Sequence, residues 1–524
     1  MSDPGAGAHA TPVFFPVAPG QHAADDDRYV TMVSRGTALV VGPAAHALPA
    51  ARQLAASLRV VACVPDAPAA TGFDANPVVM IARVARVEGR LGRFVALAHQ
   101  GGAALADLGR FSPNADRTFD VVFDVGSTPL LGFEAGPPGY FAPGPDPDGI
   151  AHAVASARTL VGTFRKPRYV RHARALCTHA AQGIAGCARC VDACPAGAIR
   201  SDGAALEVDP YLCQGCATCI LVCPTGAMAG TASRPPVSVA PGGPDVRTLV
   251  IGQDGAASRH VAGTDPDAAD RIAIPAIAAA GPADWLGALA NGYSRVVIRI
   301  PERVPRSTRR ALRAQQDLGR ALLAALGLPE DSIVFEEEGA APSSDTVSLS
   351  AAAAAPAAPA VNGRLALLAA IDALERRNGT IPGAAPRPLP PGAPFGTVEV
   401  DRDRCTLCMA CVNLCPTAAL TAGDSSSALR FTEAACVQCG LCSRGCPEQA
   451  ITLQPRLLPG RVARGTARVL THDRPHRCPE CGVAYIGLAL VTRAMQVMRE
   501  SGALDERAIA GLKRCPACRA ASSG

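Results

Sequence analysis

Short apolar runs in the first part of the chain alternate with a segment of helical composition. The runs Ala38–Gly42, Arg59–Pro65 and Phe119–Val125 predict buried strands, and Leu48–Leu58 predicts a helix between the first two. Strands that alternate with helices form parallel sheets, because each helix carries the chain back to the starting edge. We therefore expect residues 36–160 to form a small α/β domain of nucleotide-fold type.

A second stretch, residues 246–340, repeats this alternation. The predicted strands are Arg247–Ile251, Arg271–Ile274, Arg295–Ile300 and Ser332–Glu336, and the predicted helices are Pro282–Asn291 and Ser307–Leu326. This pattern predicts a second parallel sheet.

Polar and proline-rich segments separate these units from three cysteine-rich regions. Residues 1–35 are expected to form a disordered lead, and residues 341–395 an Ala/Pro-rich linker with one helix at Gly363–Arg377. The cysteine-rich regions are 161–230, 396–455 and 470–524. The predicted fold class is a multidomain α+β and α/β protein.

Composition excludes several classes of protein. The 524 residues carry a net charge of +5, but aromatic residues make up only 4% and do not interleave with the basic ones, so nucleic-acid binding is not expected. The N-terminus lacks a basic region followed by an apolar core, and no unbroken apolar run reaches the ~18 residues of a membrane span. With 21 cysteines in the chain, we expect a cytoplasmic protein whose thiolates hold metal rather than form disulfides.

Sixteen of the cysteines form four copies of one motif, arranged as two pairs. Three copies read C-x2-C-x2-C-x3-C-P: Cys213, Cys216, Cys219 and Cys223; Cys405, Cys408, Cys411 and Cys415; Cys436, Cys439, Cys442 and Cys446. This is the bacterial spacing for [4Fe–4S] clusters, in which the fourth cysteine binds the cluster of the other motif. Four such copies make zinc binding a poor alternative. A purely structural role for the clusters is a weaker interpretation than electron transfer.

The paired motifs predict four [4Fe–4S] clusters with crosswise ligands. The expected sets are Cys213, Cys216, Cys219 and Cys194; Cys177, Cys187, Cys190 and Cys223; Cys405, Cys408, Cys411 and Cys446; Cys436, Cys439, Cys442 and Cys415. The segments PAGAI, PTGAM, PTAAL and PEQAI follow the fourth cysteines, and their last, apolar residue is expected to cover a cluster.

The first copy is altered, because nine residues separate Cys177 from Cys187. An inserted loop that returns Cys177 to the cluster is the preferred reading. His179 is a rival ligand, and three cysteines alone would leave a [3Fe–4S] centre.

The C-terminal region carries a different cysteine pattern. Cys478, Cys481, Cys515 and Cys518 form two C-x2-C pairs, which predict a structural Zn²⁺ with four thiolate ligands, with a rubredoxin-like iron as the alternative. The remaining Cys63 lies in an apolar run and is expected to be a buried core residue.

Two other features are candidate binding sites. Gly42 follows the first strand, but the glycines needed for close approach of a pyrophosphate are missing, so a degenerate nucleotide fold is expected. The basic stretch 165–169 is expected to be a solvated face, or else to dock an acidic partner. No set of residues indicates a catalytic site, so the chain is not expected to be an enzyme in its own right.

The cysteine regions resemble bacterial dicluster ferredoxins. Residues 246–338 resemble the small iron–sulfur subunit of methyl-viologen-type hydrogenases through IPAIAAAGPADWLGALANGYSRVVI and GLPEDSIVFEE, without the cysteines of that family. The stretches PPGYFAPG, LVGTFRKPRYV and CTHAAQGIAGCARCVDACPAGAI, with the CPEC and CPAC tail, are similar to polyferredoxins that accompany molybdenum formate dehydrogenases. This resemblance implies redox protein partners, including a formate dehydrogenase.

The sequence predicts a carrier that relays single electrons between redox partners. Two alternatives remain open: a non-catalytic assembly factor for a molybdenum enzyme, and an accessory oxidoreductase subunit whose active site lies on a partner.

Overall fold

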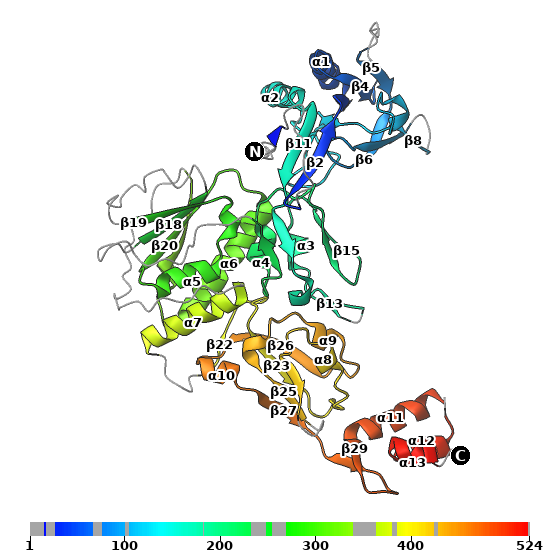
Figure 1. The fold of residues 1–524 in the computed structure, drawn as a ribbon, viewed down its shortest axis with the longest axis vertical. Helices are drawn as coiled ribbons and strands as arrows, with labels where there is room; N and C mark the ends of the chain where they lie inside the picture. The colour runs from blue at the N-terminus through cyan, green and yellow to red at the C-terminus, as the bar shows by residue number, and fades with distance from the viewer. Residues whose placement is uncertain are drawn as a thin grey trace.

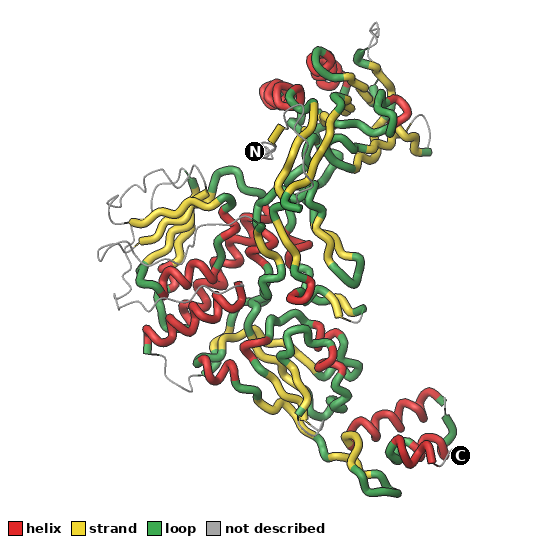
Figure 2. Tube along the Cα trace, in the orientation of Figure 1, coloured by secondary structure: helices red, strands yellow, loops and turns green. Residues whose placement is uncertain are grey.

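A computed structural model of the chain places its units one after another along an elongated molecule (Figure 1). The structure describes residues 15–16, 27–66, 76–99, 104–181, 183–231, 248–253, 269–338, 363–379, 385–423, 428–502 and 504–521. Figure 2 shows strands and helices mixed in every unit except the mainly helical C-terminal tail. Among the described residues, no helix is long and apolar enough to cross a membrane.

The N-terminal unit is built on a five-stranded parallel sheet, as the strand–helix alternation predicts. Its order is β10-β9-β3-β4-β5. The strands are β3 Thr37–Val41, β4 Arg59–Val64, β5 Val78–Ile81, β9 Val121–Asp124 and β10 Tyr140–Phe141. Helices α1 Ala44–Ala55 and α2 Pro147–Arg158 pack on one face of the sheet. The antiparallel strands β6 Arg83–Glu88, β7 Val95–His99 and β8 Leu105–Asp107 form a small neighbouring sheet.

The expected disordered lead is wrong for its last residues. Strand β2 Tyr29–Ser34 pairs antiparallel with β11 Gly162–Pro167, which also pairs with β1 Phe15–Pro16. Val30 and Met32 are buried. Their alternation with exposed residues is the period of a half-buried strand, so the N-terminal unit extends on both sides of 36–160. The other residues of the lead lie outside the described part, apart from 27, 28 and 35.

The middle unit contains the second predicted parallel sheet, in the order β19-β18-β20-β21. Its strands are β18 Thr248–Gln253, β19 Ala269–Ile274, β20 Arg295–Ile300 and β21 Ile333–Glu337, and its helices are α5 Pro282–Ala290 and α6 Arg306–Ala325. These elements match the predicted ones to within about two residues, the usual uncertainty of element ends.

The linker expected at 341–395 contains a helix that belongs to the middle unit. Helix α7 Gly363–Asn378 lies against α5, and it buries Leu367, Ile371 and Leu374 in the same core as Trp285. Residues 363–378 are therefore not a spacer. Residues 341–362 lie outside the described part of the chain.

Two cysteine-rich modules and the tail complete the chain. The first module contains β12 Val170–His172, β13 Ala180–Ala181, β14 Ile184–Ala185, α3 Arg189–Ala193, β15 Ile199–Ser201, β16 Leu206–Val208, α4 Thr218–Val222 and β17 Met228–Gly230. The second contains β22 Arg387–Pro388, β23 Gly396–Val400, α8 Ala410–Asn413, β24 Leu420–Ala422, β25 Ala428–Phe431, α9 Leu441–Arg444, β26 Ile451–Leu457, α10 Arg461–Gly465 and β27 Arg468–His472. The tail contains β28 Pro475–Arg477, β29 Ala484–Gly487, α11 Leu488–Ser501, α12 Glu506–Gly511 and α13 Pro516–Ala521.

Candidate cluster and metal sites

The structure brings the sixteen motif cysteines together in four groups. Site I contains Cys177, Cys187, Cys190 and Cys223; site II contains Cys194, Cys213, Cys216 and Cys219; site III contains Cys405, Cys408, Cys411 and Cys446; site IV contains Cys415, Cys436, Cys439 and Cys442. The cysteines of sites I and III each line one cavity. In sites II and IV the cysteines lie close enough to act on one another electrostatically. Each site thus takes three cysteines from one motif and one from its partner motif.

The three regular motifs share an unusual backbone conformation. Residues between their cysteines have positive φ angles: Gly215 (73°), Ala217 (62°), Leu407 (53°), Met409 (61°), Gln438 (54°) and Gly440 (82°). This conformation is sterically unfavourable for non-glycine residues, and they retain it only where the surrounding structure holds them in it, often at functional sites. Here the turn lets the N–H groups of Gly215, Leu407 and Gln438 donate to the sulfur of the cysteine two residues earlier.

The altered first motif reaches the same arrangement through a hairpin. Strands β13 and β14 pair antiparallel, and Cys187 N donates to Thr178 O at 2.9 Å across the base of the hairpin. Cys177 therefore lines the cavity of site I with Cys187 and Cys190. The N–H of His179 donates to the Cys177 sulfur, as the matching residue does in each regular motif.

His179 is engaged elsewhere and is a poor ligand candidate. Its Nδ1 lies 2.8 Å from Cys187 O, and its Nε2 lies 2.6 Å from Ser201 Oγ. Because both ring nitrogens have hydrogen-bond partners, a metal would have to break one of these bonds. The imidazole instead ties the inserted hairpin to β15.

Apolar side chains cover the sites at the predicted offsets after the fourth cysteines. Ile199 and Met228 are buried with the cysteines of the first module, and Leu420 and Ile451 with those of the second. Such a cover excludes water from the sulfurs, which is one of the factors that set the potential of a bound cluster.

Each module also holds one buried cation beside a site. Lys166 is fully buried, and its Nζ donates to Tyr211 O at 2.5 Å and to Cys213 O at 2.7 Å. Arg364 of α7 donates through Nη2 to Cys436 O at 2.9 Å. Burial lowers the pKa of Lys166 to about 8 and that of Arg364 to about 10. The expectation of a solvated basic stretch at 165–169 is wrong for Lys166.

The chemistry of the four sites fits a metal cluster. Burial raises the pKa of Cys190 and Cys411 to about 12 and that of Cys213 and Cys436 to about 11. Four thiolates packed this closely would repel one another in an apolar setting unless a cation compensated their charge. All 21 cysteines have free thiols, so disulfides do not account for the grouping.

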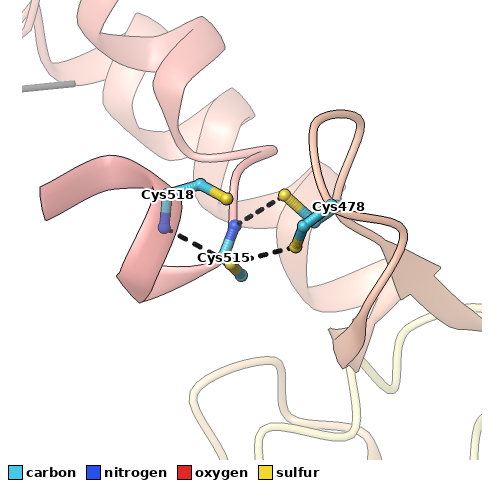
Figure 3. A group of neighbouring side chains, drawn as sticks. Cys478, Cys515 and Cys518 are labelled. Atoms are coloured by element: carbon cyan, nitrogen blue, oxygen red, sulfur yellow. Dashed lines mark hydrogen bonds between the residues drawn. The ribbon is translucent and has the colours of Figure 1, made fainter. Parts of the chain in front are cut away.

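The four tail cysteines form a separate group in which the sulfurs all lie within 4.8 Å of one another (Figure 3). Cys478 and Cys481 lie in the turn between β28 and β29, and Cys515 and Cys518 lie at the start of α13. The N–H of Cys515 donates to Cys478 Sγ at 3.4 Å. Backbone N–H groups, first that of Cys481 and then that of Cys515, lower the pKa of Cys478 to about 6. The group could hold a metal ion.

At the N-terminal sheet, a carboxylate lies where a nucleotide fold would bind phosphate. Asp66 Oδ1 accepts from Ala44 N at the start of α1 at 3.1 Å. A Cβ on Gly42 would lie 2.8 Å from the side chain of Val125. Since a helix N-terminus attracts anions, Asp66 competes for the position of a phosphate group.

Comparison with known protein families identifies the two modules. A family profile described as a 4Fe-4S dicluster domain matches residues 185–227, and a second profile of the same description matches residues 404–451. No curated protein matches the chain. The first match begins after Cys177, so it covers the regular part of the first module and omits most of the inserted hairpin. Two dicluster domains imply four [4Fe–4S] clusters and electron transfer.

Proposed function

We propose that this chain relays single electrons between redox proteins, including a formate dehydrogenase system in the cytoplasm. The observation that carries the proposal is the grouping of sixteen thiols into four buried sites, within two modules that match dicluster domains. Paired sites suit electron transfer, because an electron can pass directly between two neighbouring clusters without a diffusing carrier.

In this proposal sites I to IV each bind one [4Fe–4S] cluster through their four cysteines. A bound cluster supplies a one-electron couple. The residues of the chain hold the sulfurs, exclude water through side chains such as Ile199 and Ile451, and donate N–H groups to the thiolates. No proton needs to move, because the ligand set is the same in both redox states.

An assembly factor for a molybdenum enzyme is the second candidate, favoured by the two α/β units that show no cluster motif. Rapid re-reduction of the purified protein by formate dehydrogenase would support the carrier. A dehydrogenase whose cofactor content, rather than its turnover once the cofactor is in place, depends on this chain would support the assembly factor. Bound flavin would favour an oxidoreductase subunit.

Iron analysis tests the ligand assignment. The anaerobically purified protein should contain about sixteen cluster irons, and Cys177→Ala should retain about twelve, or about fifteen with a [3Fe–4S] centre at site I. The matched control is Cys63→Ala, which removes a buried thiol of β4 outside every motif. An unchanged iron content and unchanged EPR spectrum in Cys177→Ala would remove Cys177 from the ligand set.

For the tail, we propose a structural Zn²⁺ bound by Cys478, Cys481, Cys515 and Cys518. Four thiolates with no open position are typical of structural zinc. Cys481→Ala should lose the single zinc equivalent while keeping the cluster iron, as measured by elemental analysis. Its expected structural effect is faster hydrogen exchange in α13 and in the turn between β28 and β29, the two segments that the metal would join. Iron at this site with the red colour of a rubredoxin centre would contradict the assignment.

A further inference from the structure

The hairpin inserted between Cys177 and Cys187 lies between the two modules. In Figure 1 the β13 label marks this hairpin directly above α9 of the second module. The regular motifs have two residues at this position, so seven of the nine residues between Cys177 and Cys187 are additional to the spacing that the ligands need. Their contacts indicate another role.

Apolar contacts join the β14 side of the hairpin to the second module. A methyl group on Gly445 would lie 2.8 Å from Cδ1 of Ile184, so the Ile184 side chain packs directly on the backbone at the end of α9. Gly186 makes a similar approach, because a Cβ there would lie 3.0 Å from Cγ of Leu441. Leu441 is fully buried.

A polar contact fixes the same joint. Arg444 Nε donates to Ala185 O at 2.7 Å, and Arg444 Nη2 donates to Cys439 O at 2.8 Å. One guanidinium therefore connects the backbone of the hairpin to the backbone of a site IV cysteine. Its planar array of donors holds two carbonyls in a fixed relation, which a single ammonium group would do less well.

These contacts bring site I and site IV together across the module boundary. Gly186 immediately precedes Cys187 of site I, and Leu441 lies between Cys439 and Cys442 of site IV.

We propose that the hairpin 178–186 is the joint that turns two separate cluster pairs into one path, in the order site II, site I, site IV, site III. This inference rests on the proposed electron-transfer function. The step across the joint is one electron, given up at site I and taken up at site IV, with no bond made or broken. Without the joint, each module would exchange electrons only within its own pair.

The test compares full-length Ile184→Arg with wild type and with Ile184→Leu as the conservative control. Arginine at 184 places a second cation beside Arg444 and removes the apolar contact with Gly445, so the hairpin should separate from α9. Hydrogen exchange of residues 178–186 and 441–445 reports the docking. EPR of the fully reduced protein reports the magnetic interaction between the modules, and iron analysis reports cluster content.

Ile184→Arg should keep the wild-type iron content and show faster hydrogen exchange at residues 178–186 and 441–445. It should also lose the part of the EPR line broadening that arises from the interaction between the two modules. Ile184→Leu should match wild type in all three measurements. Faster exchange with unchanged inter-module broadening would overturn the joint. If Ile184→Arg fails to bind iron at site I, the test is repeated with Arg444→Ala, which changes only the second module. Hydrogen exchange and EPR broadening then decide whether the hairpin is the joint. An iron-free wild-type protein would instead refute the proposed function itself.

Discussion

Replacement of Arg364 by methionine should lower the reduction potential of site IV by about 70 mV. A positive charge stabilises the reduced, more negative state of a neighbouring cluster. At ~10 Å and an effective dielectric of ~20 the interaction is roughly 1.7 kcal/mol, which corresponds to about 70 mV for a one-electron couple. The Arg364 guanidinium is buried and donates to the carbonyl of Cys436, the first cysteine of the fourth motif and a member of site IV.

The same substitution should destabilise the second module by about 2–4 kcal/mol, because buried carbonyl groups lose their donors. Arg364 donates to Pro394 O, Ala434 O and Cys436 O, and its guanidinium carbon lies 4.1 Å from the centre of the Phe395 ring. Methionine keeps part of the volume but none of these interactions.

Arg364→Lys separates the two effects, since lysine keeps the charge and loses the fork of donors. Potentiometric titration followed by EPR should show a near wild-type potential in Arg364→Lys, and urea unfolding should show reduced stability in both variants. Equal potential shifts in Arg364→Met and Arg364→Lys would show that charge is not the cause. Lys166→Met should lower the potential of site II in the same way, because Lys166 donates to Cys213, the matching cysteine of the first module.

Motif spacing was sufficient to predict which cysteines lie together, since four ligands around one cluster leave the chain little choice of path. The two parallel sheets were also predictable, because their central strands β3, β9 and β18 are mainly apolar runs that are buried along nearly their whole length. In both cases the information is local in the sequence.

The buried cations were not predictable in this way. Lys166 lies in a run of basic residues that looks exposed, and Arg364 lies in an alanine-rich segment that looks like a spacer. Each is buried by contacts with a module distant in sequence, and a contact of this kind has no local pattern. Only the tertiary structure shows that α7 carries Arg364 to site IV.

The inserted hairpin illustrates the same limit. The spacing of Cys177 and Cys187 gives its length and favours a loop that returns Cys177 to the cluster. Its contact with Gly445 and Arg444 joins residues about 260 positions apart, as the 259-residue separation of Arg444 and Ala185 shows. Gly445, at the end of the short helix α9, carries no sequence signal that Ile184 of the hairpin packs against it.

Replacement of Arg464 by methionine should destabilise the protein by about 3–5 kcal/mol, because it would leave a buried carboxylate without its cation. Arg464 is 3% exposed and lies on α10 of the second module. Its Nη1 lies 2.6 Å from Glu375 Oε1, and its Nη2 bonds both Glu375 and Asp372 of α7. Glu375 also accepts from Gly460 N at 3.0 Å.

The exposed neighbour Arg461 provides the matched control. Its side chain is 79% exposed and lies 3.6 Å from Asp372, a carboxylate that Arg464 also binds. Arg461→Met should therefore lower the free energy of unfolding by less than about 1 kcal/mol. Urea denaturation followed through the iron–sulfur absorbance should separate the two variants. A double variant, Arg464→Met with Glu375→Leu, should recover much of the loss, because it removes both charges together.

The Arg464 cluster matters for electron transfer because it fixes the second module to the middle unit, on the side away from the hairpin. If both attachments set the distance between sites I and IV, Arg464→Met should also speed hydrogen exchange in the hairpin 178–186. Unchanged exchange there, together with the expected loss of stability, would show that the hairpin alone holds the two modules in register.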